Sequence, residues 1–199
     1  MGVSRYTHFP ASEGISGFSF AGVACGIKKN GTKDLGLILC DRPCAAAGVF
    51  TRNRVQAAPV RVGKRRLRSK TAQAVLVNSG NANACTGPGG TEAAVTSCSR
   101  LADALGIKKH HIIPCSTGVI GVPLPVKKII RALPRLAAHA SPAGMPDFAE
   151  AILTTDTRTK TVCLGHRTRR GMLRICGAAK GSGMIMPDMA TMLAFITTN

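Results

Sequence analysis

Four short polar segments of this sequence contain residues that could take part in catalysis. They are rich in Gly, Ser, Thr, Asn and Lys, and they span residues 78–83 (NSGNAN), 116–121 (STGVIG), 154–157 (TTDT) and 180–184 (KGSGM). Each lies beside a predicted strand or helix, where a scaffold commonly presents polar groups to a substrate. The sequence has no nucleotide-binding glycine motif, no H-E-x-x-H and no G-x-S-x-G. Taken one at a time, the four segments indicate nothing more than turns.

Cysteine and histidine spacing gives little support for a metal site. Cys40 and Cys44 are spaced C-x3-C, and His110, His111 and Cys115 lie close together, but neither group has a second pair at zinc-finger spacing. The chain is also too long and too apolar to need disulfides for stability. We therefore expect no metal ion, and free thiols in a reducing compartment.

The chain is strongly basic, with a formal net charge of +18. Such a charge is typical of nucleic-acid-binding proteins. Six of the ten residues 61–70 are basic, but no aromatic residue interrupts this run to stack on bases, and the chain has no Trp and one Tyr. We predict a solvated, mobile loop at residues 63–71, and keep a basic nucleic-acid-binding protein as an alternative function.

Apolar patterning predicts one α/β domain in this chain of 199 residues, of which 45% are hydrophobic. No segment approaches the roughly 18 apolar residues that a membrane-spanning helix needs. The N-terminal region lacks a clear cationic lead and cleavage site, so we predict no secretory signal and a soluble, cytoplasmic protein. The expected strands are 34–40, 74–77, 112–121, 161–164, 172–175 and 192–196, and the expected helices are 92–105, 125–133 and 147–153.

Turn residues set the predicted ends of these elements. Residues 41–43 (DRP) would end the first strand, and residues 78–83 would halt the second. Pro134 would close the second helix, because a proline has no backbone N–H to donate. The two strands between 161 and 175 flank a basic turn and predict a hairpin. The last strand is apolar throughout, which predicts burial between two layers and two neighbouring strands.

Taken together, the polar segments resemble a known family. Residues 34–38, 47–51, 53–55, 78–87, 116–121, 154–157, 180–184 and 189–193 match, in order, motifs of the ornithine acetyltransferases. The resemblance extends from about Gly17 to Thr198. It implies a layered α/β sandwich and a transferase of arginine biosynthesis that moves acetyl from N-acetylornithine to glutamate. Some members also use acetyl-CoA as the donor, and no other cofactor is implied.

The resemblance assigns the nucleophile to Thr191. Ala190-Thr191 is similar to the family's self-cleavage junction. There the threonine hydroxyl attacks the preceding carbonyl, an N→O acyl shift forms an ester, and water hydrolyses the ester to release a new N-terminus. An N-terminal threonine can use its own α-amine as the base that activates its hydroxyl. The same hydroxyl would then carry the acetyl group from donor to glutamate. Without the surrounding motif, Thr191 would be the β-branched first residue of a buried strand.

Further roles at the oxyanion and at the substrate follow from the resemblance. The Thr117 hydroxyl and the Gly118 backbone N–H would form an oxyanion hole, and Thr154, Lys180 and Thr191 would contact the substrate. The ordinary alternatives are a strand-end turn for Thr117 and Gly118, a loop residue for Thr154, and a solvated surface lysine for Lys180.

The chain departs from the family at its C-terminal end. Asn199 stands where the family usually has Asp, and the sequence stops eight residues after Thr191. We therefore expect a single, incomplete domain, with 1–190 as the future α chain and 191–199 as the start of the β chain. The partner would be the missing β half, in a heterotetramer of two α and two β chains. Alone, the chain is expected to be inactive, and an inactive truncated relative is a further alternative.

Overall fold

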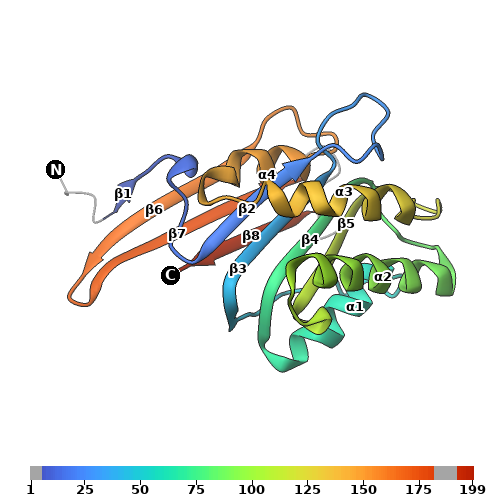
Figure 1. The fold of residues 1–199 in the computed structure, drawn as a ribbon, viewed down its shortest axis with the longest axis horizontal. Helices are drawn as coiled ribbons and strands as arrows, with labels where there is room; N and C mark the ends of the chain where they lie inside the picture. The colour runs from blue at the N-terminus through green and yellow to red at the C-terminus, as the bar shows by residue number, and fades with distance from the viewer. Residues whose placement is uncertain (1–5, 182–191) are drawn as a thin grey trace.

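The computed structural model describes residues 6–181 and 192–199 as two four-stranded sheets with helices around them (Figure 1). The first sheet, in the order β2-β3-β4-β5, consists of β2 (Phe18–Val23), β3 (Leu35–Ala45), β4 (Thr71–Asn81) and β5 (Ile112–Val119). The second, in the order β1-β6-β7-β8, consists of β1 (Thr7–His8), β6 (Lys160–Thr168), β7 (Gly171–Lys180) and β8 (Leu193–Thr198). The α-helices are α1 (Ala58–Arg66), α2 (Gly87–Leu105), α3 (Val126–Ala138) and α4 (Met145–Ala151).

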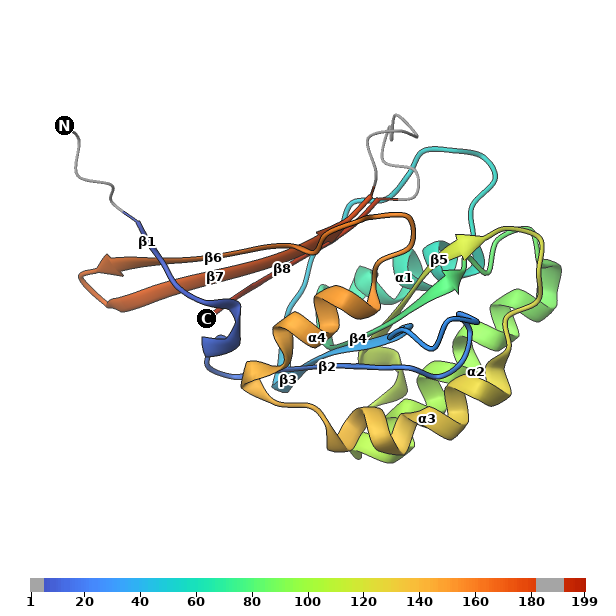
Figure 2. The same cartoon turned by 90° about the horizontal axis from the view of Figure 1, so that it is seen from above.

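The elements form layers. Helix α4 packs between the two sheets, whereas α2 and α3 cover the opposite face of the first sheet (Figure 2). Strand β3 contributes to both cores because successive side chains of a strand point to opposite faces. Leu35 and Leu37 belong to the core against α2 and α3, and Ile38 belongs to the core around α4. This two-sided burial explains the nearly continuous apolar run of β3, and the predicted α/β sandwich is confirmed.

Two glycines let α4 approach the first sheet closely. A Cβ atom on Gly22 would lie 2.0 Å from the Asp147 carbonyl oxygen, and one on Gly36 would lie 3.0 Å from the Phe148 ring. Phe148 is fully buried and also packs edge-on against Phe195 of β8, with ring centroids 5.3 Å apart. The helix therefore connects the two sheets through a core that leaves no room for larger side chains at these glycines.

The first two predicted strands exist but are longer than expected. Strand β3 continues through Pro43 to Ala45, with an irregular register between Leu39 and Cys44, and proline is tolerated in a strand at such an irregularity. Strand β4 does not halt at Asn78 but continues to Asn81, because these polar side chains find hydrogen-bond partners inside the protein. Strand β2, in a glycine-rich apolar segment, was missed.

The three predicted helices are confirmed with shifted ends. Helix α2 begins at Gly87, five residues earlier than predicted, and ends as expected at Gly106, which has a φ of 65°. Helix α3 continues past Pro134 to Ala138, so the prediction that proline closes it is wrong. Burial of Leu133 and Leu136 on either side of Pro134 offsets the lost backbone hydrogen bond.

The predicted basic loop is also wrong. Residues 58–66 form α1, and a short 3-10 helix (Leu67–Ser69) follows it. The buried side of α1 consists of small residues and one valine, Val62, so its apolar stripe is too weak to stand out from the basic residues around it.

The predicted hairpin is confirmed as β6 and β7, and it contains a disulfide between Cys163 and Cys176. The expectation that every thiol is free is therefore wrong for this pair. The two cysteines face each other across the strands, a relation that a spacing of 13 residues does not reveal.

Strand β8 is confirmed, but among the described residues it pairs only with β7, and Ile196 is 77% exposed. At its end, Asn199 accepts from Arg174 N and donates to Met172 O.

Candidate active site

Thr117 and Gly118 lie at the carboxyl end of β5. Strands β4 and β5 are parallel, so this end lies beside the end of β4, and Gly118 pairs with Gly80. Gly118 has a φ of 134°, and a Cβ atom on it would lie 2.3 Å from the Gly80 carbonyl carbon. Only glycine fits there. Thr117 is buried within the strand, so the strand-end turn is the wrong alternative for it.

Lys180 brings three of the predicted site residues together. It is the last residue of β7 and only 3% exposed. Its Nζ donates to Thr117 Oγ1 at 3.1 Å and to Thr154 Oγ1 at 2.6 Å. Since Thr117 belongs to the first sheet, Thr154 follows α4 and Lys180 belongs to the second sheet, the cluster lies where the layers meet. The alternative of a solvated surface lysine is wrong.

Asp156 is a site residue that the sequence analysis missed. Its side chain is fully buried, and its Oδ1 accepts hydrogen bonds from Gly181 N at 2.9 Å and from Lys160 Nζ. Its Oδ2 is buried and has no hydrogen-bond partner among the residues that the structure describes. Asp156 lies inside the matched segment 154–157, and a carboxylate in a chain with nine acidic residues was the available signal.

Comparison with known proteins identifies the family of this chain. Residues 19–199 match the family model described as the ArgJ family. The chain belongs to the ArgJ family. It is 48% identical over 185 residues to the arginine biosynthesis bifunctional protein ArgJ of Geobacter sulfurreducens, covering 93% of this chain and 47% of the relative. It is 50% identical over 182 residues to the protein of the same name from Thermosynechococcus vestitus, covering 91% of this chain and 43% of the relative.

Two crystal structures share the fold. The Bacillus halodurans argJ structure matches with a TM-score of 0.84 and 38% identity, over 94% of this chain and 98% of the other. An ornithine acetyltransferase from Mycobacterium tuberculosis, complexed with ornithine, matches with a TM-score of 0.83 and 37% identity, over 90% of this chain and 96% of the other. The chain spans about half the length of the curated ArgJ relatives it matches.

The charges around this ArgJ site are mostly positive. Burial lowers the pKa of Lys180, and Lys160 and Lys28 lower it further, whereas the Asp156 carboxylate opposes this shift. Burial raises the pKa of Asp156, but the hydrogen bonds and charges of Lys160, Gly181 and Lys180 outweigh it, so the pKa lies below 3.8. Among the described residues, the charges that act on Lys180 are thus one carboxylate and two further lysines, a setting that favours an anionic ligand.

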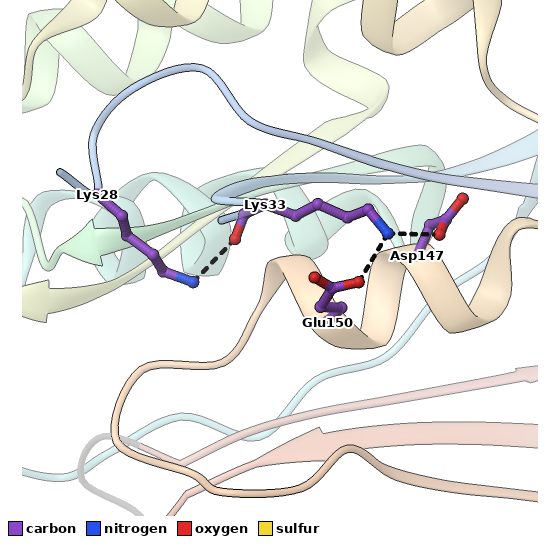
Figure 3. A network of polar contacts seen from close by, with 4 residues as sticks. All are labelled: Lys28, Lys33, Asp147 and Glu150. Carbon is purple, nitrogen blue, oxygen red and sulfur yellow. Dashed lines mark hydrogen bonds and ion pairs between the residues drawn. The ribbon is translucent and has the colours of Figure 1, made fainter. Parts of the chain in front are cut away.

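The loop between β2 and β3 lies against this ArgJ site and is tied to α4. A Cβ atom on Gly80 would lie 3.2 Å from Lys28 Cγ, so the Lys28 side chain packs beside the Gly80–Gly118 pair. Lys28 Nζ donates to the Lys33 carbonyl oxygen at 2.8 Å (Figure 3). Lys33 Nζ in turn pairs with Asp147 at 2.7 Å and with Glu150 at 2.6 Å (Figure 3).

Asp34 fixes the start of that loop. Its buried carboxylate accepts backbone N–H groups of Cys25, Ile27 and Lys28, at 2.5, 2.6 and 2.9 Å. Side chains of the polar segment 78–83 likewise form hydrogen bonds within the protein. Asn78 Nδ2 donates to the Asn81 carbonyl oxygen at 2.8 Å, and Asn78 Oδ1 accepts from Ser116 at 2.6 Å. These side chains hold the strand ends that carry the site.

Two other kinds of chemistry find no support in the described part of the chain. The thiol nearest to Thr117 in sequence is Cys115, and burial raises its pKa to about 12, which disfavours the thiolate. No group of three or more His, Cys, Asp or Glu side chains within residues 6–181 and 192–199 is arranged to hold a metal ion. No helix in these ranges has the length and apolar character needed to cross a bilayer.

The predicted nucleophile and cleavage junction, Thr191 and Ala190, lie outside the described residues. The described residues nearest to them in sequence are Gly181 and Met192. Gly181, bonded to Asp156, precedes the undescribed segment, and Leu193 follows Thr191 by two positions. Leu193 is also the residue of β8 that pairs with Lys180.

Proposed function

We propose that this chain supplies the front half of an acetyltransferase that moves acetyl from N2-acetyl-L-ornithine to L-glutamate through an acetyl-threonine on Thr191. The observation that carries the proposal is the convergence of Lys180, Thr117 and Thr154 at the junction of the two sheets. This constellation occurs in a chain of the ArgJ family whose structural relatives include an ornithine acetyltransferase. Acetyl-CoA is proposed as a second acetyl donor.

The geometry suits acyl transfer. Attack on an acetyl carbonyl creates an oxyanion, and aligned donors stabilise it. Because Thr117 Oγ1 accepts a hydrogen bond from Lys180, its own hydroxyl proton can be donated to that oxyanion. Gly118 would add a backbone N–H beside it. The buried ammonium of Lys180 suits a substrate carboxylate, and the surplus of positive charge supports this assignment.

The activated nucleophile would arise by self-cleavage between Ala190 and Thr191. The Thr191 hydroxyl would attack the Ala190 carbonyl carbon, the peptide C–N bond would break as an ester forms, and water would hydrolyse that ester. Residues 1–190 would then be the α chain and 191–199 the start of the β chain. This chain covers 98% and 96% of the two matched crystal chains but less than half of the curated relatives. The difference supports division of the full-length protein near residue 190.

The complete enzyme would be a cytoplasmic heterotetramer of two α and two β chains, with the β half supplying the remaining substrate contacts. Each of these features comes from the family resemblance.

Self-cleavage is the direct test. The chain is co-expressed with the second half of the Geobacter sulfurreducens relative, and the products are weighed by mass spectrometry. We expect a fragment that begins at Thr191, together with transfer of acetyl from N-acetylornithine to glutamate. Thr191→Ala should remain whole and inactive, whereas Thr161→Ala, at an exposed threonine of β6, should behave as the wild type. An uncut wild-type chain in a folded complex would overturn the proposal.

A further inference from the structure

The two carboxylate oxygens of Asp156 differ in their hydrogen bonding. Oδ1 holds the backbone, since it accepts from Gly181 N at 2.9 Å and from Lys160 Nζ. Oδ2 is buried and unpartnered within the described residues. A buried carboxylate oxygen that lacks a partner is unfavourable, and it calls for an explanation beyond packing.

The backbone bond alone does not require a charge. An asparagine at position 156 would place a carbonyl oxygen where Oδ1 lies, and it could accept the same hydrogen bond from Gly181 N. A carboxylate at this position differs from that amide mainly in its negative charge. Among the described residues, the charged groups that act on Lys180 are Asp156 after α4, Lys160 on β6 and Lys28 in the loop after β2. Asp156 is the anionic member of this set.

The surroundings of Lys180 oppose its charge. Its side chain is almost fully buried, and two other lysines lie close enough to disfavour a third ammonium. A lysine that binds a carboxylate must nevertheless be protonated. The Lys180 Nζ also donates hydrogen bonds to Thr117 and Thr154. In the part of the chain that the structure describes, the opposing negative charge comes from Asp156.

We propose that Asp156 is a positioning residue for Lys180: its charge holds Lys180 as an ammonium, and its bond to Gly181 N fixes the backbone next to Lys180. The electrostatic part of this proposal rests on the position of the buried Asp156 carboxylate, which the 2.9 Å bond to Gly181 N holds beside the residue that follows Lys180. Its consequence for substrate binding rests on the function proposed above. Lys160 has the opposite influence, because it pairs with Asp156 and repels Lys180.

The test is a titration of Lys180 in the 199-residue chain, labelled with [ε-13C]lysine and kept in low-salt buffer. Lys180→Arg identifies the signal. Asp156→Asn keeps the acceptor for Gly181 and removes the charge, so the pKa of Lys180 should shift down. Lys160→Gln should shift it up. Asp41→Asn, at an exposed acid, is the matched control and should leave it in place.

Opposite shifts separate an electrostatic role from a structural one, because local loosening would expose Lys180 in both variants and move its pKa in one direction. No shift in Asp156→Asn, or shifts of the same sign in the two variants, would overturn the proposal. In the co-expressed enzyme, Asp156→Asn should raise KM for the carboxylate substrate at least roughly tenfold at neutral pH. Correct shifts with no effect on KM would count against the substrate role of Lys180 and leave the role of Asp156 intact.

Discussion

Replacing Thr117 by alanine tests the oxyanion hole. The substitution removes one hydroxyl, which accepts from Lys180 Nζ at 3.1 Å and which we propose donates to the oxyanion. Loss of one such donor slows the chemical step by roughly 10²–10³, or about 2.7–4 kcal/mol of transition-state stabilisation. Lys180 keeps its shorter bond to Thr154, at 2.6 Å, so the cost in folding stability should be only about 1–3 kcal/mol.

The assay is acetyl transfer from N-acetylornithine to glutamate by the co-expressed halves, with donor concentration varied. Thr117→Ala should lower kcat and change KM for the donor little, the pattern of an interaction made only in the transition state. Thr117→Ser keeps the hydroxyl and should recover most of the rate. Thr154→Ala, which removes a second acceptor of Lys180, should act mainly on KM.

The reasoning fails if Thr117→Ala turns over at the wild-type rate while it remains folded by circular dichroism. It also fails if the serine variant is as slow as the alanine variant, because the hydroxyl would then not be the reactive feature. In either case Thr117 would only support Lys180.

Two further predictions concern stability and association. Because the pKa of Asp156 lies below 3.8 in the folded state, its contribution to stability is present above about pH 4 and is lost as the pH falls through the lowered pKa. Urea unfolding from about pH 6 to about pH 3 should therefore show a weaker acid dependence for Asp156→Asn, and an unchanged slope would contradict the assignment. Val162, Ile175 and Ile196 form an apolar outward face on the second sheet, so the isolated chain should self-associate at physiological salt, where repulsion is screened beyond about 8–10 Å. Ile196→Lys should reduce association in sedimentation velocity; a compact wild-type monomer insensitive to salt would contradict it.

Local patterns predicted the fold where burial is regular. Strand β3 was found because its apolar run is nearly continuous, as in a strand buried on both faces. Helix α2 was found because its apolar residues follow the helix period and Gly106 marks its end. The errors occurred where tertiary contacts override local signals. Pro134 remains inside α3 because leucines on either side are buried, and the basic run is helical although its buried side is mostly small residues.

The site was predicted only through the family motifs. Nothing in the residues alone indicates that Thr117, Thr154 and Lys180 meet, since 63 positions separate the first and last of them. Asp156 was missed because a carboxylate in a polar turn is expected to be solvated, whereas its side chain is buried and bonded to Lys160 and to Gly181, which is distant in the sequence. The disulfide was missed for a similar reason, because strand register rather than spacing brings Cys163 and Cys176 together.

Because the site depends on both sheets, helix α4, which packs between them, helps to keep the site residues together. Thr117 lies near the carboxyl end of a strand of the first sheet, and Lys180 is the last residue of a strand of the second. Any sliding of one sheet on the other (Figure 2) would therefore separate them. Helix α4 opposes such sliding through the buried ring of Phe148, and Ser79 Oγ of β4 donates to the last carbonyl of the helix, at Ala151, with a distance of 2.6 Å. Because Thr154 follows that end of the helix by three residues, the connection that joins the layers also places the second acceptor of Lys180. The fold therefore fixes the geometry of the site through its core, and the polar residues complete it.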